Sequence, residues 1–288
     1  MRERNVPAEL LRIFQFWYGN QENRVRWADK LSDSYRLGCG VRQGGLTSPK
    51  LFNLYVNDLI VGLSSKRIGC RVDDVTINNI SYADDMVLLS PTVRALNELL
   101  KICEEYAKAH GLTYNVKKSE FLVFKAVGGK CPESVPAIKL NGVELKRVTK
   151  FKYLGHLVTD DLKDHEDIER ERRALAVRCN MLVRRFARCS PSVKITLFKS
   201  YCQTVNALRV QYNNGFRMLL GLPRFCSASG MFAEARSDDF YAILRKKAAS
   251  LLCRIRASSN SILRTIAGRY DSPITRHLAR VLVKRNTD

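Results

Sequence analysis

The sequence predicts an α+β fold in which a mixed strand-and-helix part is followed by an all-helical part. Up to about residue 160, short runs rich in β-branched and aromatic residues alternate with segments of helical apolar spacing. After Asp160 the strand signals stop, and one helical segment follows another. We therefore expect two domains, residues 1–160 and residues 161–288, and a chain of 288 residues is long enough for each to have a core.

Local signals place the elements of the first part. A helix over residues 7–18 begins at a proline, which suits the first helical turn. A helix over residues 90–110 ends at Gly111, a residue type that accepts the left-handed conformation after a helix. The dipeptide Asn141-Gly142 predicts a tight hairpin turn. The expected strands cover residues 23–27, 34–37, 69–80, 113–115, 120–124, 138–145 and 151–155.

The second part is expected to contain helices only. The first of them has acidic residues near its start and Arg184, Arg185 and Arg188 near its end, which matches the helix dipole. Gly221 and Pro223 end the third helix. The expected helices cover residues 164–189, 191–206, 207–220, 238–258 and 273–285.

The stretch from Ile77 to Ser90 predicts a β-hairpin with two adjacent carboxylates, Asp84 and Asp85, at its tip. Asp is disfavoured in strands and favoured in tight turns. The apolar flanks are expected to bury the strands and to hold the tip rigid; they are Ile77, Ile80, Met86, Val87, Leu88 and Leu89. Two carboxylates fixed at one tip repel each other unless a cation lies between them. A metal site is one interpretation, and an ordinary polar turn, as expected for Asp73-Asp74, is the other.

A glycine-rich loop over residues 38–47 leads into a helix for which Ser48 is the expected N-cap. Gly44 and Gly45 carry no Cβ, so a ligand backbone or base can approach closely. Arg42 and Gln43 add a charge and a bidentate amide at the same place. The alternative is an ordinary glycine loop before a core helix.

Positive charge is concentrated in the second part. The formal net charge is +21, and from Arg172 to the end 23 Lys and Arg stand against 5 Asp and Glu. Such an asymmetry favours nucleic acid as a partner, because a merely solvated surface mixes both signs. An anionic membrane is less favoured, since no segment combines a basic and a strongly apolar face. The candidate backbone-binding residues are Arg172, Arg173, Arg184, Arg185, Arg245, Lys246 and Lys247.

Cysteine usage and hydropathy indicate an intracellular protein, nuclear or cytoplasmic. The nine Cys contain no Cys-x-x-Cys pair and the four His lie far apart, which argues against a zinc module and a disulfide framework. No apolar run approaches the ~20 residues of a membrane span. The first residues lead into no signal-peptide core.

Four short motifs stand in one order along the first part. Arg42-Gln-Gly-Gly-x-x-Ser-Pro49 opens a helix, and Tyr82-Ala-Asp-Asp85, Gly111-Leu-x-x-Asn-x-x-Lys-Ser119 and Phe151-x-Tyr-Leu-Gly155 follow. The ordered set resembles the reverse transcriptases of non-LTR retrotransposons, the jockey-like group in particular. The resemblance continues into the downstream segment 206–223 and so covers nearly the whole chain. Retroviral-type enzymes and intron-encoded maturases are neighbouring families, and viral RNA polymerases usually carry Gly where this hairpin has Tyr-Ala.

The resemblance implies a partial right-hand polymerase palm, an antiparallel sheet with packed helices, in residues 1–160 and a basic, thumb-like region in residues 161–288. Asp84 then matches the main metal-binding carboxylate, Asp85 its helper, and Lys118 a lysine near the nucleotide phosphates. The implied cofactor is Mg²⁺ or Mn²⁺, since two-metal phosphoryl transfer needs carboxylates that hold the ions ~3.5–4 Å apart.

The same resemblance implies an RNA template, a DNA primer and deoxynucleotides as partners; a membrane is not expected, since no segment suits an anchor. The thumb-like helices would hold the duplex by its phosphates. The residues matched to template and nucleotide binding are Arg42, Gln43, Gly44 and Gly45, and those matched to the primer grip are Tyr153, Leu154 and Gly155.

One motif of the family has no counterpart. Its reverse transcriptases carry a further metal-binding Asp upstream, in a pattern like Asp-x-x-x-Ala-Phe-Asp, whereas only Asp29 and Asp33 precede Arg42 here, in a polar connection. The sequence therefore resembles the C-terminal part of such an enzyme, and it predicts one of two functions: RNA-directed DNA synthesis, or binding of RNA or an RNA–DNA hybrid without chemistry. A decayed element copy is a third interpretation.

Overall fold

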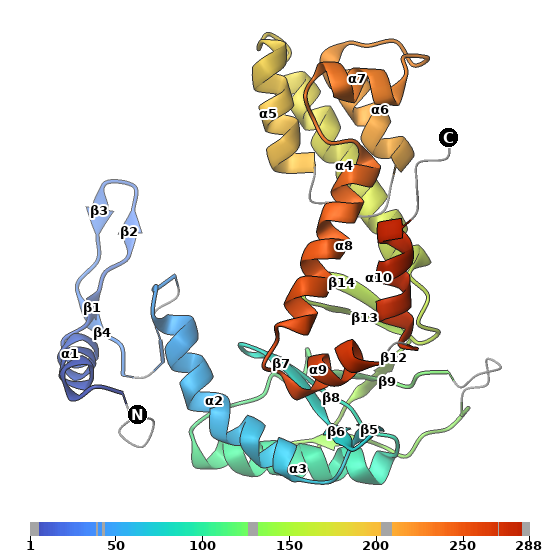
Figure 1. Cartoon of the computed structure of the whole chain (residues 1–288). Coiled ribbons are helices and arrows are strands. Elements are labelled where there is room, and N and C mark those ends of the chain that lie inside the picture. Colours follow the sequence, from blue (N-terminus) through green and yellow to red (C-terminus); the bar gives the residue numbers. More distant parts are fainter. Residues whose placement is uncertain are drawn as a thin grey trace. The chain divides into compact units, whose positions relative to one another are not determined.

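The computed structural model describes residues 6–38, 40–41, 44–125, 132–202, 209–269 and 271–283. The chain forms two compact units of mixed helix and strand (Figure 1). Unit 1 comprises Met1–Cys70 and Thr76–Thr113, and unit 2 comprises Arg71–Val75 and Tyr114–Asp288. The last strand ends at Thr159, and every later element in the described residues is a helix, as predicted. The domain boundary at Asp160 itself stays a prediction.

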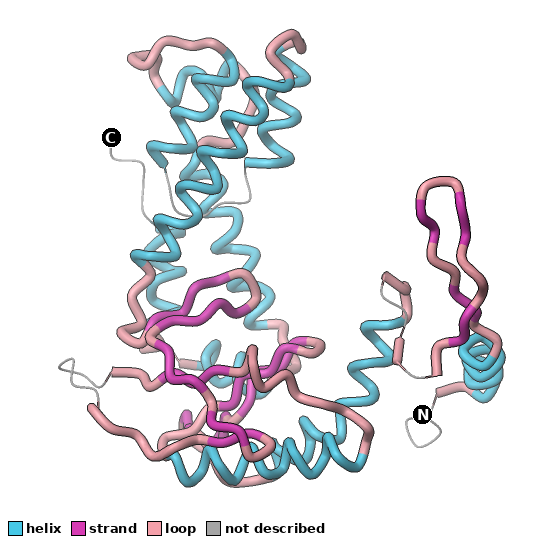
Figure 2. The backbone as a smooth tube through the Cα atoms, turned by 180° about the vertical axis from the view of Figure 1, so that it is seen from behind, coloured by secondary structure: helices cyan, strands magenta, loops and turns pink. Residues whose placement is uncertain are grey.

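Unit 1 contains three helices and several short strands among its described residues. β1 pairs with β4 and β2 pairs with β3, which together form one hairpin (Figure 2). Almost all side chains of this hairpin are exposed. The elements are α1 (Ala8–Gly19), β1 (Glu22–Asn23), β2 (Arg26–Trp27), β3 (Lys30–Leu31), β4 (Tyr35–Arg36), α2 (Ser48–Ser65), β7 (Asn79–Tyr82), β8 (Asp85–Leu88) and α3 (Val93–Ala109). A further hairpin, β5 (Cys70–Val72) with β6 (Val75–Ile77), turns at Asp73-Asp74 as expected; its residues Arg71–Val75 belong to unit 2.

The packed part of unit 1 is formed by α2 and α3. Leu59 and Leu63 of α2 and Leu99 of α3 are almost fully buried. The side chain of Thr92 caps α3, and Gly111 follows the helix with φ +64°. The predicted end of this helix is confirmed, because the left-handed glycine lets the next N–H return to a carbonyl of the last turn.

Two local predictions in this region are wrong. Ser48 is the first residue of α2, and Thr47 occupies the N-cap position. The segment 113–115 forms no strand, because the Asn115 carbonyl accepts hydrogen bonds from the N–H groups of Lys118 and Ser119 and closes a turn. Such local bonds compete with strand pairing.

The strands of unit 2 from β9 to β14 form two hairpins with two-residue turns and one parallel pair. Asn141 and Gly142 have φ of +52° and +76°, which confirms the predicted tight turn between β10 and β11. β9 pairs in parallel with β12, and β13 pairs antiparallel with β14. The strands are β9 (Glu120–Leu122), β10 (Lys139–Leu140), β11 (Val143–Glu144), β12 (Lys146–Val148), β13 (Lys150–Tyr153) and β14 (His156–Thr159).

The predicted helices of the second part are confirmed, with ends that differ by a few residues. The predicted ends at 203–208 and 284–285 lie outside the described residues. Two helices were not predicted, α7 and α9, although Ser227 and Asn260 are good N-cap residues and cap them with their side chains. The helices are α4 (His165–Arg185), α5 (Pro191–Cys202), α6 (Arg209–Leu220), α7 (Ala228–Glu234), α8 (Phe240–Arg256), α9 (Ser261–Gly268) and α10 (Pro273–Val283).

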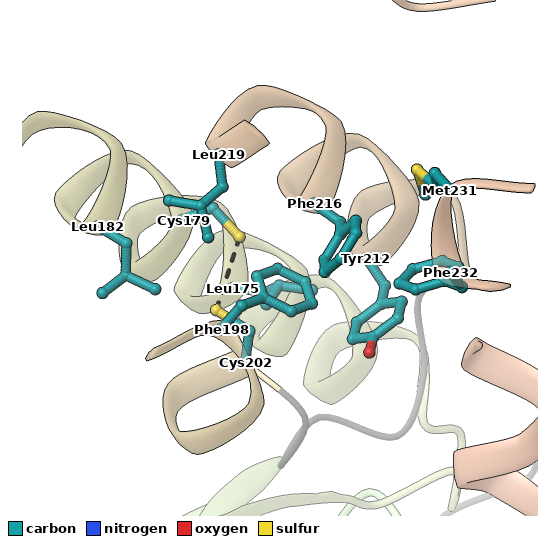
Figure 3. Packing of buried hydrophobic residues seen from close by; sticks show 10 residues of the cluster. All are labelled: Leu175, Cys179, Leu182, Phe198, Cys202, Tyr212, Phe216, Leu219, Met231 and Phe232. Atoms are coloured by element: carbon teal, nitrogen blue, oxygen red, sulfur yellow. Dashed lines mark hydrogen bonds between the residues drawn. The ribbon is translucent and has the colours of Figure 1, made fainter. Parts of the chain in front are cut away.

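The core of unit 2 lies between α4, α5, α6 and α7 (Figure 3). Phe198 and Phe216 meet edge to face at 5.0 Å between ring centroids, and Tyr212 stacks on Phe232 at 5.4 Å. Aromatic pairs of this kind add to the stabilisation that burial gives. None of the helices in the described residues is long and apolar enough to cross a membrane.

Candidate carboxylate and nucleic-acid sites

The predicted carboxylate hairpin is formed by β7 and β8. Tyr82 pairs with Asp85 across the two strands, so that Ala83 and Asp84 make the turn between them. Ala83 has φ +52°, in the left-handed region that a residue with a Cβ rarely adopts. Both aspartates are exposed. The hairpin therefore presents two adjacent carboxylates to solvent, one in the turn and one at the start of β8.

The expected burial of the flanking residues is only partly correct. Ile80 is 47% exposed, whereas its neighbours Asn79 and Ser81 are half-buried. Side chains alternate between the two faces of a strand, and in β7 the polar positions face inward. Met86 and Val87 of β8 are half-buried, so their burial is closer to the predicted burial than that of Ile80 is.

A buried asparagine ties the base of this hairpin to the end of α2. Asn78 is 2% exposed, and its side-chain amide donates to the carbonyls of Leu63, at 2.6 Å, and Ile68, at 2.9 Å. Its Oδ1 accepts a hydrogen bond from the Asn79 side chain at 2.8 Å. A Cβ on Gly69 would lie 2.6 Å from the Asn78 Cβ, so only glycine fits there. Sequence analysis missed this anchor, and an Asn inside an apolar run was the available signal.

The donor chemistry of the tip fits a single divalent cation. Mg²⁺ prefers oxygen ligands, and in phosphoryl-transfer sites it usually takes one or two carboxylates together with waters and substrate phosphates. Asp84 and Asp85 supply two carboxylates on neighbouring residues. Across the described residues, no three His, Cys, Asp or Glu side chains come together as a metal-holding group. The two aspartates can therefore contribute two ligands to a cation, but the described residues do not supply a third His, Cys, Asp or Glu ligand beside them.

The glycine-rich loop is described only in part. Arg42 and Gln43 lie outside the described residues. Gly44 has φ +77° and open space where a Cβ would be, and the Gly45 carbonyl accepts a hydrogen bond from the Ser48 N–H at 3.2 Å. The backbone around Gly44 is thus accessible to a ligand.

The residues matched to the primer grip come together in the β13–β14 hairpin of unit 2. Tyr153 ends β13, and Leu154 and Gly155 form its turn with φ of +47° and +87°. The Gly155 carbonyl accepts a hydrogen bond from the Arg170 guanidinium of α4 at 2.7 Å. Lys118 also belongs to unit 2, where it is exposed in the turn that follows Asn115.

Asp167 of α4 joins the same hairpin to the helix. Its carboxylate accepts a hydrogen bond from the Leu157 N–H at 3.0 Å and pairs with Arg170 at 2.8 Å. Burial by itself would raise the pKa of Asp167, but the hydrogen bonds from Leu157, Arg170 and His156 outweigh it and lower the pKa below its usual value. The hairpin is therefore held on α4 by a charged contact.

Three of the candidate backbone-binding residues are already paired with acids. Glu169 binds Arg172 at 2.6 Å and Arg173 at 3.0 Å, and these hydrogen bonds lower the pKa of Glu169 to about 2. Lys246 lies 2.7 Å from Asp238. Their positive charges are locally offset, so they contribute less to the surface potential than their number suggests.

The other candidates differ in their surroundings. Arg184 and Arg185 are exposed, and within the described residues no acid pairs with them. Arg245 is half-buried and has a partner. Burial lowers the pKa of Lys247. The end of α4 is therefore the best-placed of these positions for phosphate contacts.

Comparison with known proteins defines the class of the chain. The family model described as "Reverse transcriptase (RNA-dependent DNA polymerase)" matches residues 2–158, more than half of the chain. The chain belongs to the reverse transcriptase family, whose polymerase palm accounts for the mixed helix-and-strand part.

The relatives are proteins of non-LTR retrotransposons, as the motifs predicted. The chain is 34% identical over 122 residues to the Pol polyprotein of the type-1 element R2 of Popillia japonica, which covers 41% of this chain and 17% of that protein. It is 32% identical over 145 residues to that of the type-2 element R2DM of Drosophila melanogaster, covering 48% and 13%. To the RNA-directed DNA polymerase from mobile element jockey of Drosophila melanogaster it is 22% identical over 207 residues, covering 69% and 22%. The chain thus spans less than a third of the length of these relatives.

Proposed function

We propose that this chain is the palm and thumb portion of an RNA-directed DNA polymerase from a non-LTR retrotransposon. The observation that carries the proposal is the β7–β8 hairpin, which presents Asp84 and Asp85 at an exposed tip within the segment that matches the family. Asn78 anchors the base of this hairpin and keeps the tip in one position.

In this function the two carboxylates hold a divalent cation, Mg²⁺ or Mn²⁺. Held there, such a cation would supply Lewis-acid chemistry toward phosphate oxygens. Lys118 offsets phosphate charge. Gly44 and Gly45 allow the template or the incoming deoxynucleotide to approach the backbone, with Arg42 and Gln43 beside them.

The template–primer duplex is held by unit 2. The turn Tyr153–Gly155 contacts the primer strand, and Arg170 and Asp167 fix that turn on α4. The exposed ends of the basic helices bind the phosphates of the RNA–DNA hybrid, with Arg184 and Arg185 in the leading position.

Residues 1–288 by themselves are expected to bind a template–primer duplex and to extend it poorly. The upstream carboxylate of the family pattern is missing from these residues, and each ~1.4 kcal/mol of lost transition-state stabilisation costs a factor of ten in rate. The second candidate function, binding of RNA or an RNA–DNA hybrid without chemistry, is favoured by the absence of a third carboxylate near the tip among the described residues.

Manganese binding followed by electron paramagnetic resonance tests the assignment of the carboxylate pair. We expect Asp84→Asn to weaken Mn²⁺ binding at least tenfold, because one of two charged ligands is removed. Asp74→Asn, an exposed aspartate in the β5–β6 turn, is the matched control and should leave the affinity unchanged. Equal effects of the two substitutions on the Mn²⁺ affinity would show that Asp84 is not a specific metal ligand. Strong Mg²⁺-dependent primer extension that Asp84→Asn abolishes would instead show that the chain completes its own catalytic site.

A further inference from the structure

Unit 2 has a polar pocket of about 440 Å³. Its lining residues come later in the sequence than the primer-grip hairpin. Its walls come from three helices and one connection: Lys199 near the end of α5, Phe232 in α7, Arg236, Ser237 and Asp238 between α7 and α8, and Lys246 in α8. Neither Lys199 nor Arg236 belongs to the family motifs of the sequence.

The lining carries a surplus of positive charge. Three cations, Lys199, Arg236 and Lys246, face one carboxylate, that of Asp238. Lys246 Nζ lies 2.7 and 2.8 Å from the two Asp238 oxygens, and Lys199 Nζ donates to the Arg236 carbonyl at 3.3 Å. An ammonium group has three donors, so both lysines keep hydrogens for a further acceptor. The Arg236 guanidinium is exposed, and the described part of the chain offers it no acceptor.

A buried hydroxyl in the same wall also lacks an acceptor. Ser237 Oγ is shielded from solvent and has no hydrogen-bond partner among the described residues. Its backbone is fixed, because the Ser237 N–H donates to the Phe232 carbonyl at 2.9 Å and the Tyr212 hydroxyl donates to the Asp238 carbonyl at 3.3 Å. Because Ser237 Oγ is shielded even from water, the donors that a ligand in the pocket can reach are those of Lys199, Lys246 and Arg236.

We propose that this pocket binds a phosphate group of a nucleic-acid backbone. A phosphate carries charge and several acceptor oxygens, which matches a cationic lining with free donors. The one aromatic ring in the lining, Phe232, is 2% exposed, so the pocket offers no ring face on which a base could stack. The pocket therefore holds the strand by its phosphate and reads no sequence.

The inference rests on the proposed function, since the strand it holds belongs to the template–primer duplex. It adds a contact formed by α5, the α7–α8 connection and α8 to the contacts proposed for the end of α4. The charge surplus of the second part supplies the long-range attraction for a polyanion.

Lysine acylation of the wild-type chain, with and without an RNA–DNA hybrid, tests the pocket without any substitution. We expect the hybrid to slow acylation of Lys199 and Lys246 at least fivefold. Lys194, on α5 but outside the pocket lining, is the internal reference and should change less than twofold. A deoxynucleoside triphosphate at 1 mM distinguishes the other source of phosphate. Protection of Lys199 by the nucleotide but not by the hybrid would overturn the assignment to a strand backbone.

Hybrid binding by variants completes the test. The double substitution Lys199→Gln with Arg236→Gln is expected to weaken binding about tenfold and to reduce the slope of log K against log salt by about one. The matched double substitution Arg224→Gln with Arg264→Gln removes the same charge from exposed positions that lie neither in the pocket lining nor at the end of α4, and should weaken binding by less than threefold.

The outcomes separate the inference from the function on which it rests. Equal losses in the two double variants, with the wild type still binding the hybrid, would overturn the pocket and leave the proposed function standing. If the wild type binds no hybrid, both the proposed function and the pocket assignment fail. Lys199 protection that equals Lys194 protection in the wild type also overturns the pocket, whatever the stability of the variants.

Discussion

Gly215 provides a test of how closely α6 approaches α4 in the core of unit 2. A Cβ at this position would lie 2.3 Å from Cys179 Sγ, 3.3 Å from Cys179 Cβ and 3.6 Å from the Phe198 ring. The first distance is far shorter than a real contact, and Cys179 is 1% exposed, with its sulfur 3.8 Å from that of Cys202 (Figure 3). Gly215→Ala must therefore displace the sulfur or the helix.

The size of the effect follows from two opposing contributions. Overpacking a core of this kind costs up to about 3 kcal/mol, whereas replacing Gly by Ala inside a helix gains about 1 kcal/mol. We expect a net loss near 2 kcal/mol at Gly215. For a unit of this size that corresponds to a fall in melting temperature of about 4–8 °C.

Thermal unfolding followed by circular dichroism measures this change. The control is Gly230→Ala in α7, where the new Cβ would meet Ser227 at an ordinary 3.7 Å and the melting temperature should not fall. Adding Cys179→Ala to Gly215→Ala removes the clashing sulfur, so the two changes together should cost less than the sum of their separate effects. A Gly215→Ala variant that melts at or above the wild-type temperature, or strict additivity in the double variant, would refute the close packing of α6 on α4.

Three further predictions concern the two candidate sites. Asn78→Ala should destabilise unit 1 by about 2–4 kcal/mol, because one buried and one partly buried carbonyl lose their donor; a change below about 0.5 kcal/mol in urea unfolding would contradict the anchor. The pKa of Asp167 is lowered in the folded chain, so its contribution is complete above its unfolded pKa of about 4 and is lost as pH falls through the folded pKa. Asp167→Asn should therefore lower the melting temperature at pH 7, and this effect should shrink as the pH falls below about 4; an effect that stays the same over this range would be inconsistent with the charged contact. Arg184→Gln should weaken hybrid binding more than Arg172→Gln, since Glu169 already offsets the charge at the second position; equal losses would mean that this ion pair opens on binding.

Local chemistry explains which parts of the fold could be predicted from the sequence. The turn at Asn141-Gly142 depends on two residues that accept positive φ, and the end of α3 depends on Gly111. The β7–β8 hairpin depends on a carboxylate pair between two apolar runs. In each case the signal lies within a few residues of the element it determines.

One error arises from a distant contact, and two arise from contacts between near neighbours in the sequence. Which face of β7 is inward depends on Asn78 and its bonds to the end of α2, so the exposure of Ile80 could not be read from apolar spacing alone. The segment 113–115 has strand-forming residues but turns through Asn115. The ion pair of Arg172 with Glu169 joins neighbours on one helix at i,i+3 spacing, a local signal that the sequence already carries.

The part of the site that sequence analysis missed is similarly non-local. The pocket on unit 2 combines Lys199 with Arg236 and Lys246, which come from separate elements that only the folded core brings together. No short sequence motif contains these three residues, so their proximity could not be predicted from a motif. The family motifs, by contrast, predicted the carboxylate pair, because the hairpin that presents it is continuous in the sequence.

The affinity of residues 1–288 for an RNA–DNA hybrid, measured by fluorescence anisotropy over a series of salt concentrations, tests the central claim most directly. The claim is that the basic helical part holds a template–primer duplex through its phosphates. We predict that log K falls linearly with log salt, with a slope that reflects several phosphate contacts and is the same for hybrids of unrelated sequence. An affinity that does not change between 50 and 300 mM salt, or no binding at low salt, would contradict the account.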